Sequence, residues 1–186
     1  MLLTEWYLPE ATGRAVPDEV TQGYIAAWRA CLANLPPCPA GLLLRDYHRD
    51  NLMWLPERPG VRACGVLDFQ DALRGHPAYD LASLLDDARC DVPPAIQSAC
   101  IARYLAATGL PGEDFRTGFA VMAAQRHARI IGLFVRLLRR DGKPGYLAHL
   151  PRVWRMFERA LKHPALEPLR LWVDRHLPPP LRRIGA

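Results

Sequence analysis

Residues 43–71 read LLRDYHRDNLMWLPERPGVRACGVLDFQD, and this stretch decides the fold. Short apolar runs alternate in it with polar turns, and such runs bounded by Pro, Gly, Asn and Asp are typical of strands. We expect strands over residues 41–46, 52–55 and 64–69, with a turn at Pro59 and Gly60 before the last of them. The sequence therefore predicts a small hairpin whose ends carry Asp, Asn and His side chains.

The rest of the chain has the periodicity of helices, with apolar residues recurring every three or four positions. Helices are expected over residues 18–35, 81–89, 94–108, 113–140, 146–161 and 164–176. Three aromatic residues on the later helices are expected in the core: Trp154, Phe157 and Trp172. The tail, residues 178–186, is expected to be loose. The layout predicts one domain over residues 1–186 with an α+β fold that is mostly α, a short β-hairpin in a helical body.

Composition narrows the class of protein. The net charge is +5, but the basic residues are scattered along the helices and no aromatic platform accompanies them. We therefore expect no nucleic-acid partner. Five cysteines without a CxxC pair favour a reducing compartment over a disulfide framework or a zinc site. The first ten residues lack the pattern of a signal peptide, and the longest apolar helix carries several arginines. We expect a cytoplasmic protein without a membrane span, and the 22 arginines against two lysines suggest a GC-rich bacterial genome.

The spacing of three polar residues points to phosphoryl transfer. Asp46 and Asn51 are five residues apart across a loop that follows a strand, and Asp68 ends the return strand of the hairpin. Transfer to an alcohol needs a carboxylate that orients the hydroxyl and takes its proton, and oxygen ligands for the magnesium that bridges the phosphates. Asp, Asn and Asp in the order D-x4-N … D-F is the pattern of kinase catalytic and metal-binding loops.

At these residues the chain resembles a known family. LRDYHRDNLMWL resembles the HGDLHxxN-type loop of aminoglycoside phosphotransferases and choline kinases, and VLDFQDALRGHPAYDLASLL resembles their metal-binding loop and following helix. The segments TEWYL, AQRHARIIGLF and GKPGYLAHLPRVW are similar to the bacterial anomeric kinases of N-acetylmuramate and N-acetylglucosamine in cell-wall recycling. The resemblance implies the C-terminal, catalytic lobe of a protein-kinase-like fold, with ATP as co-substrate, Mg²⁺ as cofactor and a sugar as acceptor.

The resemblance also implies roles for individual residues. Asp46 matches the catalytic base, and His48 matches the second histidine of the loop, which helps to shape it. Asn51 and Asp68 match the magnesium ligands. Asp80 matches an aspartate that ties down the loop backbone, although a capping role at the start of its own helix explains it equally well.

Other positions are expected to be peripheral or remain open. Leu44 stands where the family loop usually begins with histidine. Because that histidine usually braces the loop and is not the base, we expect its loss to affect the rigidity of the loop more than the chemistry. Asp50 and Asp71 are expected on the surface or in loops, and Asp86 with Asp87 on a solvated helix face.

Arg126 and His127 either line the acceptor pocket or form ion pairs within the helical bundle. The acceptor itself stays open among N-acetylmuramate, N-acetylglucosamine, other sugars, choline-like alcohols and aminoglycosides. The few acidic residues outside the catalytic segment disfavour polycationic aminoglycosides.

The half of such a kinase that grips ATP is not recognisable in this sequence. None of the thirteen glycines forms a GxG pair, and neither Lys143 nor Lys162 lies on a strand before the catalytic loop. The first 40 residues hold one expected helix and no hairpin. We therefore expect the nucleotide lobe to be supplied in cis by a longer protein or by another chain, and the face that receives it to be apolar.

Two alternatives to a kinase remain. One is a noncatalytic lobe that keeps the acceptor pocket, and the other is a metal-dependent phosphohydrolase that uses Asp46 and Asp68. The hydrolase would need a DxD start or a GNH run, and the sequence has neither.

Overall fold

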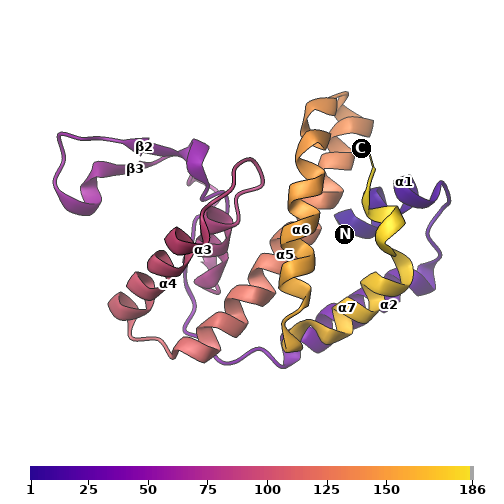
Figure 1. Ribbon diagram of the computed structural model, residues 1–186, viewed down its shortest axis with the longest axis horizontal. Coiled ribbons are helices and arrows are strands. Elements are labelled where there is room, and N and C mark those ends of the chain that lie inside the picture. The colour runs from indigo at the N-terminus through magenta and orange to yellow at the C-terminus, as the bar shows by residue number, and fades with distance from the viewer. Residues whose placement is uncertain (185–186) are drawn as a thin grey trace. The chain divides into compact units, whose positions relative to one another are not determined.

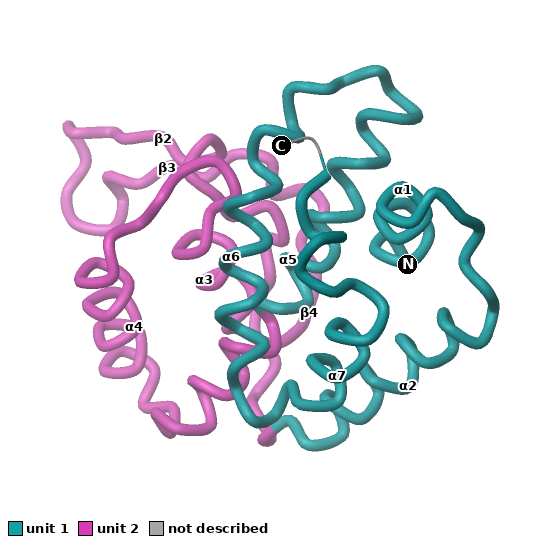
Figure 2. Tube along the Cα trace, turned by 45° about the vertical axis from the view of Figure 1, so that its right-hand side comes forward, with its two compact units in different colours: residues 1–35, 123–186 teal, residues 36–122 magenta. Residues whose placement is uncertain are grey.

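The computed structural model describes residues 1–184, and helices dominate it (Figure 1). The chain divides into two compact units (Figure 2). Unit 1 comprises Met1–Leu35 and the chain from Ala123 onward, and unit 2 comprises Pro36–Met122. The α+β, mostly α fold class is confirmed, and the single domain over the whole chain stays a prediction. Within the described residues no helix combines the length and the apolar character needed to cross a membrane.

Unit 1 begins with a helical segment that the sequence did not predict. A π-helical turn, η1 (Leu3–Tyr7), runs into α1 (Leu8–Thr12), which ends where Gly13 takes a φ of +66°. Tyr7 is fully buried, and its hydroxyl donates a hydrogen bond to the Leu181 carbonyl at 2.9 Å. The expectation of one helix in the first 40 residues was wrong, because long-range packing stabilises a segment too short to signal itself locally.

One glycine allows this segment to approach so closely. A Cβ on Gly132 would overlap the backbone of Leu2 and lie 2.6 Å from the nitrogen of Leu3. Gly132 belongs to α5 (Gly112–Asp141), whose first part, to Met122, lies in unit 2 and whose remainder lies in unit 1. The bare backbone at Gly132 therefore makes room for the N-terminal chain.

The other elements of unit 1 are helical and follow the predicted pattern. They are α2 (Asp18–Ala33), η4 (Pro144–His149), α6 (Leu150–Leu161), η5 (Pro164–Leu166), α7 (Glu167–His176) and η6 (Pro179–Arg182). α2 packs along α7 (Figure 1). Between them the rings of Tyr24 and Trp172 lie 4.8 Å apart, and the Trp172 indole donates to the Val20 carbonyl at 3.1 Å. Trp172, Trp154 and Phe157 are all buried, which confirms the predicted core.

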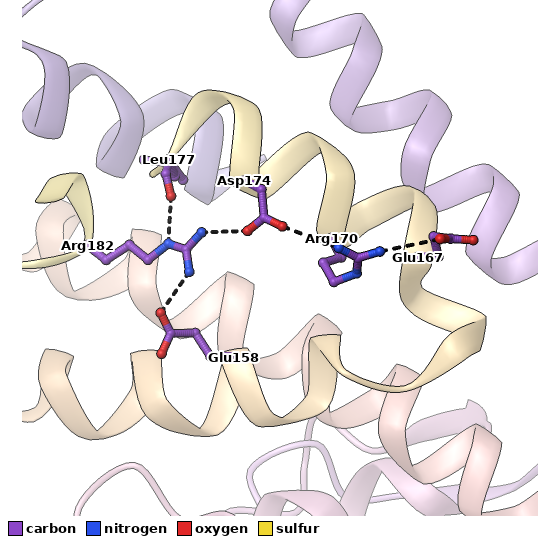
Figure 3. Close-up of polar contacts among 6 residues, drawn as sticks. All are labelled: Glu158, Glu167, Arg170, Asp174, Leu177 and Arg182. Carbon is purple, nitrogen blue, oxygen red and sulfur yellow. Dashed lines mark hydrogen bonds and ion pairs between the residues drawn. The ribbon is translucent and has the colours of Figure 1, made fainter. Parts of the chain in front are cut away.

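The tail is anchored as far as the structure describes it, which corrects the expectation of a loose end. Figure 3 shows the Arg182 guanidinium between two acidic side chains, with Glu158 and Asp174 each at 2.8 Å. Its Nε donates to the Leu177 carbonyl at 2.6 Å, and the group lies 5.6 Å from the centre of the Trp154 ring. Charge and stacking hold the 3₁₀ turn η6, and the last two positions of the predicted loose tail lie outside the described residues.

Unit 2 contains two separate two-stranded ribbons, both antiparallel. β1 (Gly41–Leu43) pairs with β4 (Leu73–Gly75), with Leu42 opposite Arg74. β2 (Leu52–Trp54) pairs with β3 (Cys64–Val66), with Met53 opposite Gly65, and Figure 1 shows these two as a hairpin. The 3₁₀ turn η2 (Arg49–Asn51) directly precedes β2, and the 3₁₀ turn η3 (Gly60–Ala63) lies between β2 and β3. The hairpin was predicted, but β4 was not.

Two strands end earlier than expected because the backbone turns sharply near their expected ends. The first stops at Leu43, since Arg45 takes a φ of +70°, and the third stops at Val66, since Asp68 takes a φ of +55°. The pairing with β4 depends on Gly75, because a Cβ there would lie 2.5 Å from the Leu43 side chain. A glycine in a three-residue strand carries no strand signal of its own, so β4 follows from this contact rather than from propensity.

The helices of unit 2 are α3 (Ala78–Leu85), α4 (Pro94–Thr108) and the first part of α5. α4 has the predicted bounds. α3 is shifted toward the N-terminus relative to the predicted 81–89. Stacked rings of Tyr104 and Phe115, 5.1 Å apart, join α4 to α5.

Candidate active site

The loop after β1 is folded by hydrogen bonds within itself. The Asp46 N–H donates to the Leu44 carbonyl at 2.9 Å, and the His48 N–H donates to the Asp46 carbonyl at 3.1 Å. The Asn51 side-chain amide donates to the same Asp46 carbonyl at 2.8 Å. The backbone of Asp46 is thus fixed from both directions, while its side chain is only half-buried.

Asp80, in the first turn of α3, fastens this loop to the helix. Its carboxylate accepts the N–H of Leu44 at 2.6 Å and the N–H of Arg45 at 3.0 Å. Hydrogen bonds to a carboxylate are stronger than neutral ones, and here they hold Arg45 in a left-handed conformation that non-glycine residues rarely adopt. α3 begins at Ala78 with Pro77 as its N-cap, so Asp80 does not occupy the N-cap position predicted before Leu81. Between the two roles considered from the sequence, the geometry favours tying the loop backbone.

The predicted metal ligands lie at the ends of the β2–β3 hairpin. The Leu67 N–H donates to the Asn51 carbonyl at 2.9 Å, which joins the return strand to the loop directly beside Asp68. Because the Asn51 side-chain nitrogen donates to Asp46, its side-chain oxygen is the atom left to face a cation. The Asp68 side chain is exposed, and one of its oxygens accepts the Gln70 amide at 2.6 Å.

This donor set fits magnesium. An amide oxygen and a carboxylate are hard ligands, and Mg²⁺ in nucleotide sites takes one or two protein oxygens and completes its shell with phosphates and water. Within residues 1–184 no group of three or more His, Cys, Asp or Glu side chains is placed to hold a metal ion.

His48 lies beside Asn51 in the same loop. Its Nε2 is 3.4 Å from the Asn51 side-chain nitrogen, so a neutral imidazole can accept from that amide. The neighbouring Tyr47 phenol has its pKa raised, chiefly by burial. It therefore stays protonated near neutral pH. The contact with Asn51 fits a part for His48 in shaping the loop. A catalytic role for His48 stays a prediction.

Comparison with known proteins identifies the family. Residues 1–104 match the pattern of the family described as "Phosphotransferase enzyme family". The chain belongs to this phosphotransferase family. It is 48% identical over 140 residues to the N-acetylmuramate/N-acetylglucosamine kinase of Caulobacter vibrioides. The matched residues cover 75% of this chain and 39% of that protein.

Two further relatives carry the same name. The kinase of Pseudomonas aeruginosa is 37% identical over 171 residues, 86% of this chain and 48% of that protein. That of Neisseria meningitidis serogroup B is 36% identical over 158 residues, 81% of this chain and 46% of that protein. The chain thus spans less than half the length of the curated relatives it matches.

In this member of the family, two acidic residues behave differently from expectation. Asp86 and Asp87 are 4% and 2% exposed, so the predicted solvated helix face was wrong. α3 ends at Leu85, which places both carboxyl groups in the turn that follows. There Asp86 accepts the Gln97 side-chain amide at 3.2 Å, and Asp87 accepts the N–H of Arg89 at 2.7 Å.

The same turn contacts the loop after β1 through Arg89, a residue that the sequence did not single out. The Arg89 guanidinium lies 3.6 Å from the carboxylate of Asp50, which also pairs with Arg49 at 3.2 Å. On the other side of the loop, Arg45 lies 3.9 Å from the exposed carboxylate of Asp71. Asp50 and Asp71 are both exposed, as predicted. No local sequence pattern marks Arg89, because its partner is 39 positions away in the chain.

The two candidate acceptor-binding residues lie on the part of α5 that belongs to unit 1. Arg126 is 4% exposed and His127 is fully buried. The loop residues Asp46, Asn51 and Asp68 belong to unit 2. The structure therefore brings the loop residues and Asp80 together within one unit, and the role of Arg126 and His127 stays a prediction.

Proposed function

We propose that this chain is the catalytic half of an ATP-dependent kinase that phosphorylates an amino sugar, N-acetylmuramate or N-acetylglucosamine, at the hydroxyl on carbon 1. The names of the relatives support the acceptor and the reaction. The observation that carries the proposal is the pair of hydrogen bonds from Leu44 and Arg45 to Asp80, which set the loop in a fixed conformation. Preorganised positioning is the main contribution that a protein makes to phosphoryl transfer.

In this mechanism Asp46 orients the acceptor hydroxyl and takes its proton. The hydroxyl oxygen forms a bond to the γ-phosphorus of ATP, the bond between that phosphorus and the oxygen bridging to the β-phosphate breaks, and the electron pair leaves with ADP. Asn51 and Asp68 would hold Mg²⁺, which would neutralise charge on the phosphates. Asp80 and His48 keep the loop in the conformation that presents Asp46 and Asn51 together.

We further propose that residues outside these 186 grip the nucleotide, either upstream in the same polypeptide or in another chain. Apolar side chains exposed in unit 2 concentrate on the β1, β2–β3 and β4 segments: Leu42, Met53, Trp54, Val61, Leu67, Phe69 and Leu73. Trp54 is 75% exposed and Val61 is 82% exposed. Exposed apolar side chains mark interaction surfaces, and two of these, Leu67 and Phe69, flank the proposed metal ligand Asp68 in the sequence.

The setting that fits this activity is the bacterial cytoplasm, where ATP and cell-wall sugars returned for recycling are available together. All three relatives described above come from bacteria.

The experiment is a substitution of Asp46 in an enzyme that contains this chain and the nucleotide-holding half. Asp46→Asn should lower turnover by about 10²–10⁴-fold, the range that a positioned general base supplies. The affinity for nucleotide should stay the same, because Asp46 holds no metal in this scheme. Asp50→Asn is the matched control, since it changes a neighbouring aspartate in the same loop without touching the base. A variant that keeps a tenth of the wild-type turnover would remove Asp46 from this role.

A further inference from the structure

His76 occupies the junction between the β1–β4 ribbon and α3. It directly follows Gly75, the last residue of β4, and precedes the helix by one residue. Its Nδ1 accepts the N–H of Ala78, the first residue of α3, at 3.2 Å, and its carbonyl accepts the N–H of Tyr79 at 3.1 Å. The first N–H groups of a helix have no partner within the helix. His76 supplies two of them with acceptors.

The imidazole of His76 packs against Gly118, a glycine of the opposing helix α5. A Cβ on Gly118 in α5 would overlap Cε1 of the His76 ring and lie 2.6 Å from its Nε2. The ring therefore lies against bare helix backbone, where any larger residue would displace it. Burial in this position lowers the pKa of His76. The neutral ring that results is the form whose Nδ1 can accept a hydrogen bond.

From these contacts we infer that His76 is a positioning residue for the catalytic loop. α3 carries Asp80 two residues after the N–H that His76 accepts, and Asp80 in turn holds the amides of Leu44 and Arg45 next to Asp46. Fixing the start of α3 fixes the Asp80 carboxylate, and with it the left-handed turn at Arg45. The sequence pattern linked Asp80 to the loop but did not single out His76.

This inference rests on the proposed function for its effect on turnover, but its structural part can be measured without any activity. Amide hydrogen exchange of Leu44 and Arg45 is compared in the 186-residue chain and in four variants. His76→Ala should raise the exchange rate of both amides about fivefold, the effect of losing one helix cap. His76→Asn should stay within about twofold of wild type, because an asparagine oxygen can accept at a helix start. Amides of α7 in unit 1 are the internal reference and should not change.

Gly118→Ala supplies a second route to the same result, because the new methyl group displaces the ring. In the double variant with His76→Ala the alanine at position 118 should have no further effect on the two amides, since the ring that it displaces is gone. This non-additivity distinguishes the proposed contact from two independent structural lesions.

Exchange at Leu44 and Arg45 that stays within twofold in His76→Ala overturns the inference, as does an equal rise at the α7 amides, which would show general loosening. In the complete enzyme, His76→Ala should lower kcat about fivefold and leave the KM for ATP unchanged, with recovery in His76→Asn. An unchanged kcat beside faster exchange also overturns it. If the wild-type enzyme transfers no phosphate, the proposed function fails, and the exchange measurements still decide whether His76 positions the loop.

Discussion

Unit 1 and the loops of unit 2 are stabilised by different means. In unit 1, aromatic and aliphatic side chains such as Phe157, Tyr7 and Trp154 are buried against one another, with ring centres 5.3–5.7 Å apart. In the loops of unit 2, conformation depends on a few hydrogen bonds between backbone groups and polar side chains, and several apolar side chains face solvent.

The difference separates a region stabilised by packed side chains from loops whose conformation depends on a few hydrogen bonds. Both positive-φ residues other than glycine among the described residues, Arg45 and Asp68, lie in the loops of unit 2. Such conformations cost about 1–3 kcal/mol each and persist where the surroundings over-determine them. Substitutions in unit 1 should therefore mainly affect folding, and substitutions around the loops should mainly affect turnover.

The sharpest contrast compares two phenylalanines. Phe157 in α6 is fully buried, whereas Phe69, which follows Asp68, is 58% exposed. Phe157→Ala should reduce the free energy of unfolding by about 3–5 kcal/mol through the cavity that it leaves. Phe69→Ala should change it by no more than about 0.5 kcal/mol, as exposed substitutions do. Denaturant unfolding of both variants measures this, and similar losses in the two would remove the distinction between the regions.

Asp80→Ala should reverse the pattern. It removes the acceptor of two backbone N–H groups, and its cost to stability should be about 1.5–3 kcal/mol, the range for a hydrogen bond to a charged group. Turnover of the complete enzyme should fall by more than tenfold, because the Asp46 loop is released. Asp71→Ala, an exposed carboxylate near the same loop, serves as the control and should leave both quantities nearly unchanged. Full turnover in Asp80→Ala would contradict the fixed-loop account.

Within unit 1, two arginines on the same face offer a smaller test. Arg182 is 10% exposed in its side chain and makes three hydrogen bonds, whereas Arg170 is 40% exposed and pairs with Glu167 and Asp174 at 3.3 and 3.5 Å (Figure 3). Arg182→Ala should cost about 1–2 kcal/mol of unfolding free energy. Arg170→Ala should cost less than about 0.5 kcal/mol, since exposed ion pairs contribute little. A larger loss in Arg170→Ala would mean that burial does not set the value of these pairs.

Sequence reasoning succeeded where the deciding signal is local. α4 has its predicted bounds because Pro94 marks its start and Gly109, with a φ of +67°, marks its end. The spacing of Asp46, Asn51 and Asp68 predicted a shared site, and the structure places all three in the loops of unit 2, while their roles stay predictions.

Sequence reasoning failed where distant contacts decide. The N-terminal helical segment depends on its approach to Gly132, and β4 depends on the room that Gly75 leaves for Leu43. The burial of Asp87 follows from the early end of α3, which no residue before it announces. The two possible roles of Asp80 share one position in the sequence, so its hydrogen-bond partners were needed to separate them.

The central claim is that the Asp46 loop transfers a phosphoryl group when residues outside these 186 hold the nucleotide. The most direct measurement is the ATP-dependent phosphorylation of N-acetylmuramate and N-acetylglucosamine by three proteins. These are the 186-residue chain, a version that also carries the residues encoded upstream of Met1, and that longer version with Asp46→Asn. The longer version should be active, and the other two should be slower by about a hundredfold or more. Equal activity of the short chain and the longer version would contradict the account.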